Sequence, residues 1–131
     1  MAKPIACRDL KTARSRLRPL SLDDAGAMYE IYQDPETMKY WSNPPVKDID
    51  GARKLVQADL DWVEEGNAIV WAIAEPSSNN ALGIFVLFQF IKENRRAEVG
   101  YVLNREYWGK GLMTEIMTRV IDYAFDELGL H

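Results

Sequence analysis

Apolar residues recur along the chain at two spacings, which predict strands in some segments and helices in others. Residues 16–20 alternate polar and apolar side chains and predict a short strand, in which Pro19 indicates either a sheet edge or the end of the strand. Three longer apolar runs, separated by polar turn segments, lie at residues 68–74, 81–91 and 95–103. Their order predicts a three-stranded antiparallel meander.

Apolar positions three and four residues apart predict three helices. The first follows Ser21, whose side chain can form a capping box with that of Asp24, and it ends at about Gln33, because Asp34 and Pro35 disfavour its continuation. The other two are expected at residues 48–65 and from 109 or 110 to 128, with a rigid aromatic turn at residues 40–45.

The composition excludes several kinds of chemistry. The chain has 131 residues, of which 47% are apolar and 27% charged, as expected for one soluble globular domain. The single cysteine, Cys7, excludes an internal disulfide, and the single histidine, His131, is the last residue. A His/Cys metal site or a histidine-dependent nucleophile is therefore not expected, and neither is a metal cofactor. The function must use backbone groups, carboxylates, hydroxyls or a bound cofactor.

The charge is unevenly distributed along the chain. The net charge is −4, but residues 1–20 carry six basic side chains and one acid. We expect residues 1–15 to form a solvated basic tail, because no aromatic residues are interleaved with the charges as in a nucleic-acid platform. The N-terminus has no apolar signal segment, and no apolar run is long enough to span a bilayer. We therefore predict a cytoplasmic protein with neither nucleic-acid nor membrane partners.

The segment 101–115 carries the candidate chemistry. A buried strand ends there, and Gly109 and Gly111 precede a helix. Glycines allow close approach of a ligand to the backbone, and the free N–H groups of a first helical turn attract anions. Lys110 adds a positive charge and Thr114 a hydroxyl, so pyrophosphate is the natural ligand. The spacing matches neither a P-loop nor a Rossmann turn, and glycines that merely begin a helix are the alternative.

Four segments together resemble the GNAT superfamily of acetyl-CoA-dependent N-acetyltransferases, in particular the branch that acetylates ribosomal-protein N-termini, spermidine and antibiotics. The segments are residues 16–20, 97–101, 107–115 and 123–131. The resemblance implies an α+β fold with a GNAT-like mixed sheet, in which an antiparallel meander follows a first edge strand and helices flank the sheet. Residues 16–131 would form a partial, C-terminally truncated domain of this family.

The resemblance also implies how acetyl-CoA would bind as co-substrate. Backbone groups of Tyr101, Val102 and Leu103 would run alongside the pantetheine arm, and an N–H group would stabilise the oxyanion formed from the thioester. The pyrophosphate would be held by Trp108, Gly109, Lys110, Gly111, Leu112, Met113 and Thr114. Glu106 departs from the base or amide that the family usually has at the start of this loop. The amine would attack the acetyl carbon directly.

The attacking amine must lose a proton, and Glu98 is the candidate general base implied by the resemblance. The alternative is that Glu98 forms an ion pair with Arg95 or Arg96 on the sheet surface. A small-molecule or peptide amine would bind beside the first two helices. Its predicted contacts are Tyr29, Tyr32, Tyr40 and Trp41. Core aromatics beside a solvated acidic face are the alternative there.

The sequence departs from the family at its end, where the next strand of the domain is expected to begin. The family's remaining part usually supplies an asparagine that contacts the coenzyme and a hydroxyl that protonates the leaving thiolate. Two explanations are a partner chain that covers the open sheet edge, which predicts a homo-oligomer, and a fragment of a longer gene product. A non-catalytic acyl-CoA-binding or interaction module is the alternative to an active enzyme.

Overall fold

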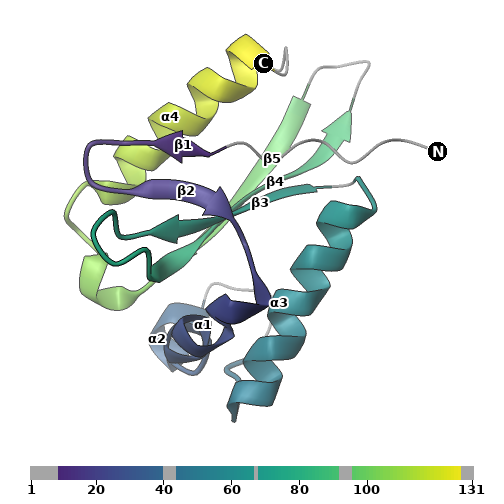
Figure 1. The fold of residues 1–131 in the computed structure, drawn as a ribbon, viewed down its shortest axis with the longest axis vertical. Coiled ribbons are helices and arrows are strands. Elements are labelled where there is room, and N and C mark those ends of the chain that lie inside the picture. The colour runs from purple at the N-terminus through teal and green to yellow at the C-terminus, as the bar shows by residue number, and fades with distance from the viewer. Residues whose placement is uncertain (1–8, 40–43, 67, 92–95, 128–131) are drawn as a thin grey trace.

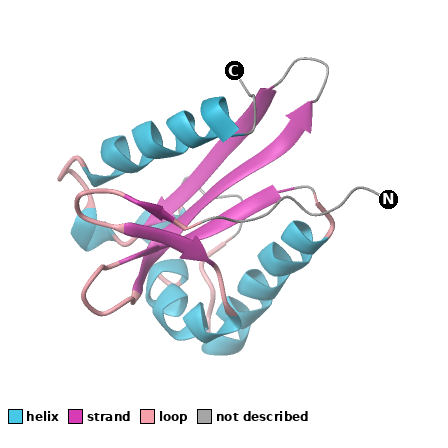
Figure 2. Cartoon of the chain, turned by 45° about the horizontal axis from the view of Figure 1, so that its top comes forward, coloured by secondary structure: helices cyan, strands magenta, loops and turns pink. Residues whose placement is uncertain are grey.

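A computed structural model of the chain describes residues 9–39, 44–66, 68–91 and 96–127. Five strands form one open sheet in the order β1-β2-β3-β4-β5, and all four pairings between them are antiparallel. Helices α1 and α3 cover one face and α4 covers the other, which gives three layers (Figure 1). Figure 2 shows α4 across the strands, on the side opposite α3. The predicted α+β class is confirmed.

The strands agree with the predicted meander and add one element to it. Their bounds are β1 Leu10–Lys11, β2 Arg16–Pro19, β3 Ala68–Ala74, β4 Ala81–Ile91 and β5 Arg96–Leu103. The prediction that the strand at 16–20 lies at the sheet edge is wrong, because β1 pairs with its outer side. Two residues are too few to show a periodic pattern, so β1 gave no signal in the sequence. Pro19 lies instead at the end of β2.

The helices agree with the predicted ones in the middle of the chain. Their bounds are η1 Leu22–Asp24, α1 Ala25–Tyr32, α2 Pro35–Met38, α3 Ile49–Glu64, η2 Arg105–Tyr107 and α4 Leu112–Glu127. The capping box of Ser21 and Asp24 is present, although it caps the 3₁₀ turn η1 that leads into α1. Asp48 caps α3 by accepting a hydrogen bond from the Gly51 N–H at 2.8 Å.

Two helix predictions are corrected. Pro35 begins the short helix α2, because proline is tolerated at the first helical position even though it stops a preceding helix. Helix α4 begins at Leu112, later than expected, because Gly109 and Gly111 have φ angles of +73° and +75°. Backbone in that left-handed region cannot belong to a right-handed helix. Most of the predicted aromatic turn, residues 40–43, lies outside the described residues, as does the expected last residue of α4, Leu128.

The core has one apolar layer on each face of the sheet. Met28 and Val56 pack from α1 and α3 on one face, and Ile116 packs from α4 on the other. The Trp71 ring of β3 meets the Tyr123 ring of α4 edge to face, with 5.8 Å between centroids. Because β3 is buried on both faces, its sequence is a continuous apolar run without alternation.

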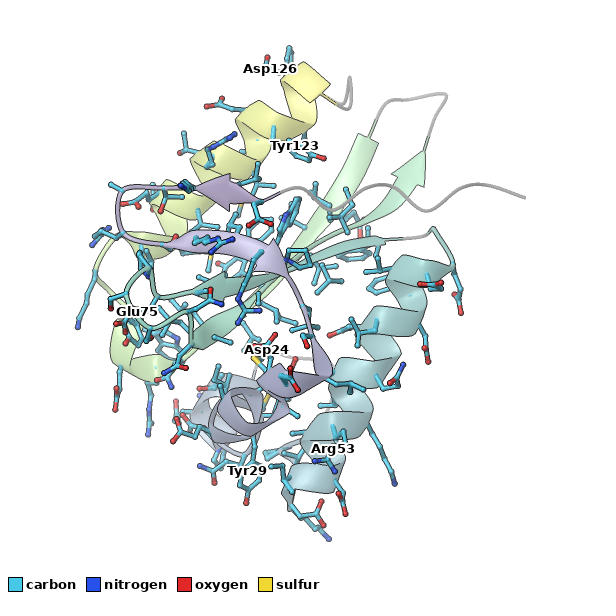
Figure 3. The ribbon with its side chains drawn as sticks, viewed as in Figure 1. Asp24, Tyr29, Arg53, Glu75, Tyr123 and Asp126 are labelled. Atoms are coloured by element: carbon cyan, nitrogen blue, oxygen red, sulfur yellow. The ribbon has the colours of Figure 1, made fainter. Side chains whose placement is uncertain are left out.

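A buried ion pair fixes the start of the helical layer against the sheet. The Arg18 guanidinium of β2 donates to both carboxylate oxygens of Asp24, at 2.9 and 2.7 Å (Asp24 is labelled in Figure 3). Arg18 also donates to the side chain and the carbonyl of Asn79 in the turn between β3 and β4. Because both charges are largely buried, removing one partner would leave the other uncompensated.

Apolar side chains remain exposed beside the outer edge of the sheet. Val99 and Tyr101 of β5 are 43% and 45% exposed, and Ile121 and Phe125 of α4 are 53% and 57% exposed. The expected homo-oligomer would cover these side chains and stays a prediction. No helix in the described part of the chain has the length and apolar character needed to cross a membrane.

Asp59 of α3 is a mostly buried carboxylate, and burial raises its pKa to about 6. The folded state therefore binds this proton more tightly than the unfolded state does. Stability from this group is fully present below about pH 4 and is lost as the pH rises through about 6. At pH 7 we expect Asp59→Asn to raise the free energy of unfolding by about 3 kcal/mol, since the pKa of Asp59 rises from 3.8 to about 6 and each pKa unit corresponds to about 1.4 kcal/mol.

Urea unfolding at pH 4 and pH 7 measures this effect. The gain from Asp59→Asn should appear at pH 7 and largely disappear at pH 4, where the wild-type carboxyl group is protonated. Asp61→Asn is the matched control, because Asp61 is an exposed acid on the same helix. An equal effect of both substitutions would show that burial of Asp59 is not the cause.

Candidate coenzyme site

A cavity of about 650 Å³ lies where β5 ends and α4 begins. Its walls come from the end of β5, the connection to α4, the first turn of α4 and one side chain of α2. The lining residues are Thr37, Gly100, Tyr101, Val102, Leu103, Tyr107, Trp108, Gly109, Gly111, Leu112, Met113 and Thr114. The structure thus brings together all the predicted coenzyme contacts except Lys110.

The backbone of β5 presents polar groups to this cavity along an open edge. Among the described strands, only β4 pairs with β5. The Asn104 N–H donates to a carbonyl of β4 at 2.7 Å, and a Cβ on Gly83 would lie 2.1 Å from the Val102 carbonyl oxygen. Val102 therefore directs its backbone groups toward β4. Because directions alternate along a strand, Tyr101 and Leu103 direct theirs toward the open edge.

The connection after β5 is held in place at both ends. The Trp108 indole N–H donates to the Leu103 carbonyl at 2.8 Å, which ties the connection back to the strand. The Asn104 side chain accepts from the Glu106 N–H at 3.0 Å and caps the turn η2. The Leu103 carbonyl is thus occupied, so the N–H of Leu103 and both backbone groups of Tyr101 are the groups available at the edge.

Residues 108–111, here called the glycine loop, lead into α4 with two left-handed glycines. A Cβ on Gly109 would meet no atom within 4 Å, so the backbone at this position is open to a ligand. The Glu115 N–H donates to the Gly111 carbonyl at 3.2 Å, which is the first hydrogen bond of the helix. The preceding N–H groups, of residues 112–114, are those that a helix leaves without an intrahelical acceptor, and they attract anions.

The Lys110 side chain is not among those that line this cavity. Its ammonium group lies over the Tyr107 ring, 5.7 Å from the centroid. With Arg14 and Glu75 it lines a second cavity of about 270 Å³ on another side of the glycine loop. A role for the Lys110 side chain in coenzyme binding stays a prediction.

Glu98 lies two residues before the cavity-lining Gly100 and is exposed. It pairs in register with Phe88 and shares a sheet face with Val102, the face that α1 and α3 cover. It is not among the residues that line the cavity. The side chains of Arg95 and Arg96, its alternative partners, lie outside the described part of the structure.

The two predicted acceptor aromatics that the structure describes, Tyr29 and Tyr32, do not line the cavity. Tyr32 is 1% exposed and belongs to the core, where burial and the nearby Asp59 charge raise its pKa. Tyr29 of α1 is partly buried, and its hydroxyl donates to the Lys47 carbonyl at 3.5 Å (Tyr29 is labelled in Figure 3). The other two, Tyr40 and Trp41, lie outside the described residues.

Sequence reasoning missed Thr37, which brings the helical layer to the cavity. Thr37 is buried, and its hydroxyl donates to the Asp34 carboxylate at 2.9 Å. That carboxylate also pairs with Arg105 of η2, at 3.3 Å. The helical layer and the connection after β5 are thus joined beside the cavity. Thr37 was missed because it belongs to α2, whose four residues are too few to show a periodic pattern in the sequence.

An open strand edge lies beside a left-handed glycine loop, a geometry that suits an extended ligand with an anionic end. Residues 14–131 match the family described as acetyltransferase (GNAT) domain, so the chain belongs to this family and the resemblance is confirmed. No cluster of three or more potential metal ligands occurs in the described residues.

Named relatives agree with this assignment. An uncharacterized N-acetyltransferase, p20 of Bacillus licheniformis, is 36% identical over 93% of this chain, which spans 68% of that protein's length. The structure of a putative ribosomal-protein-serine acetyltransferase from Vibrio cholerae matches 98% of this chain and 72% of its own, at 23% identity and a TM-score of 0.80.

A third match is the structure of spermidine N-acetyltransferase from Vibrio cholerae in complex with CoA and spermine. It covers 91% of this chain and 68% of its own, at 23% identity and a TM-score of 0.73. At this identity the match establishes a shared fold.

Proposed function

We propose that this chain transfers an acetyl group from acetyl-CoA to a primary amine, which is a protein N-terminus, a polyamine or another small amine. The observation that carries the proposal is the single cavity shared by the open β5 edge and the glycine loop. An extended thioester arm needs an open strand edge such as that of β5, and a pyrophosphate needs a group of free N–H donors such as the glycine loop leads into. Family membership supports the same chemistry.

The open edge suits the amide-containing pantetheine arm. The backbone groups of Tyr101 and the N–H of Leu103 can pair with its amides as a neighbouring strand would. The N–H groups at residues 112–114 then face the pyrophosphate. The CoA bound to the spermidine N-acetyltransferase from Vibrio cholerae supports this choice of ligand.

The proposed reaction is a direct acyl transfer without a covalent enzyme intermediate. A neutral amine attacks the acetyl carbon, the C–N bond forms and the negative charge gathers on the carbonyl oxygen. A backbone N–H at the open edge stabilises that oxyanion. Glu98, directly or through water, takes the proton that the amine must lose to attack; the C–S bond then breaks, and CoA leaves as a thiolate that takes up a proton from solvent.

The helical layer supports a cationic acceptor. Residues 23–65 contain eleven acids and four bases. Asp24 and Asp34 are neutralised by arginines from outside this segment, but several of the other acids are exposed on α1 and α3. Such a field attracts cationic amines. The spermine in the Vibrio cholerae enzyme is an amine of this kind.

Calorimetry with acetyl-CoA, followed by mass spectrometry of a panel of peptides and polyamines, tests the proposal. We expect saturable binding of acetyl-CoA and a mass increase of one acetyl group on at least one amine. Binding without acetylation would favour the non-catalytic acyl-CoA-binding module instead. Absence of acetyl-CoA binding would contradict both.

A further inference from the structure

We infer that Arg14 is a positioning residue that holds the glycine loop in its anion-binding shape and neutralises an acid beside it. The inference rests on the proposed function, since it concerns the coenzyme's pyrophosphate. Arg14 lies in the turn between β1 and β2, almost one hundred residues from the glycine loop in sequence.

Arg14 connects the glycine loop to the first turn of α4. Its guanidinium donates through Nη1 to the Lys110 carbonyl at 2.8 Å, and through Nε to the Glu115 carboxylate at 3.0 Å. Its backbone N–H donates to the other Glu115 oxygen at 2.9 Å. The carbonyl between the two left-handed glycines is therefore held from outside, so that the N–H groups of the loop remain on the cavity side.

The turn that carries Arg14 is itself fixed. The Thr12 hydroxyl oxygen accepts from the N–H groups of Arg14 and Ser15, at 3.3 and 3.0 Å, and Ser15 is 1% exposed. The Arg14 side chain is exposed, but two hydrogen bonds from its guanidinium and one from its backbone N–H, all to groups far away in sequence, define its position. Because the backbone of this turn is fixed, the Arg14 side chain can hold the glycine loop in one position.

The negative charge of Glu115 would oppose binding of an anionic ligand if Arg14 did not pair with it. It lies in the first turn of α4, beside the N–H groups that would face the pyrophosphate. A hydrogen bond from the Thr12 side chain and the N–H of Arg14 lower the pKa of Glu115, so the carboxylate is charged. An uncompensated carboxylate there would repel phosphate. Arg14 supplies the compensating charge.

The guanidinium also approaches the glycine loop directly. A Cβ placed on Gly111 would lie 3.6 Å from Arg14 Nη2. The positive charge is thus adjacent to the second left-handed glycine, where it raises the potential that an approaching anion meets. We therefore expect Arg14 to affect binding of the phosphate part of CoA and not of its pantetheine part.

The Arg14→Met variant tests whether Arg14 affects binding of the phosphate part of CoA separately from its pantetheine part. We expect the dissociation constant for CoA, measured by calorimetry, to rise about tenfold to a hundredfold, because charge-assisted hydrogen bonds and charge compensation are lost together. Binding of pantetheine, which lacks the phosphates, should be unchanged when followed by NMR. Adding Glu115→Gln to Arg14→Met should recover part of the CoA affinity, because the repelling charge is removed.

Arg16→Met is the matched control, since Arg16 lies two residues away and its side chain forms an ion pair with the exposed Asp9, away from the glycine loop. It should bind CoA as the wild type does. Wild-type CoA affinity in a folded Arg14→Met variant would overturn the inference and leave the proposed function standing. Equal losses for CoA and pantetheine would also overturn it. Absence of CoA binding by the wild type would instead contradict the proposed function, and the inference with it.

Discussion

Replacing Gly111 with tryptophan is expected to abolish measurable binding of acetyl-CoA while the chain stays folded. Gly111 lines the cavity, and its Cβ position lies 3.6 Å from Arg14 Nη2, so a large side chain there would crowd the cavity wall and displace the Arg14 guanidinium from the glycine loop. Its φ of +75° adds a backbone strain of about 1–2 kcal/mol for any other residue. A domain with a typical stability of about 5–15 kcal/mol tolerates that strain.

Two further variants separate the effect of side-chain volume from the effect of backbone strain. Gly111→Ala adds the strain with little volume, and Gly66→Ala adds a matched strain at φ +79° after α3, away from the cavity. Thermal unfolding should show similar destabilisation for these two alanine variants. Calorimetry should show near-normal acetyl-CoA binding for Gly66→Ala and the strongest loss for Gly111→Trp. A folded Gly111→Trp variant with unchanged affinity would refute the assignment of the glycine loop to the pyrophosphate.

The length of each element decided how well it was predicted from sequence. The strands β3 and β4 and the helix α3 are long enough to show a period or a continuous apolar run, and their predicted bounds agree closely with the structure. The strand β1 and the helix α2 have two and four residues, so neither can repeat a pattern. The strand β1 is held by its pairing with β2 and the helix α2 by its Asp34 cap and by Met38 in the core, contacts that so short an apolar pattern does not reveal.

In the candidate site too, local sequence signals predicted some residues, while those placed by tertiary packing were missed. The two glycines before a helix carry a backbone signal that is local, and the structure places them at the cavity as expected. Thr37 reaches the cavity from the short helix α2 and Arg14 reaches the glycine loop from the turn after β1, and both placements depend on tertiary packing. The Lys110 side chain, between the two left-handed glycines, lies over the Tyr107 ring and does not line the cavity, so its predicted contact with the coenzyme stays a prediction.

Glu98→Gln is expected to lower kcat for amine acetylation by about a hundredfold or more, the usual range for loss of a general base. Glu98 lies on the sheet face shared with α1 and α3, where the acceptor is proposed to bind. Gly100, which lines the cavity, follows it at about 6.6 Å along the strand. That distance is within the reach of a glutamate side chain and one bridging water, and an exposed carboxylate can return its proton to solvent.

Binding and turnover measured together distinguish this role from a structural one. The affinity for acetyl-CoA should be unchanged in Glu98→Gln, because the amide keeps the shape of the side chain and lies outside the cavity lining. Raising the pH should recover part of the rate, since more of the amine is then already neutral and needs no base. Glu64→Gln, on the exposed side of α3, is the matched control and should leave kcat unchanged. If Glu98→Gln retains the wild-type kcat at neutral pH, the amine loses its proton to another group or to solvent.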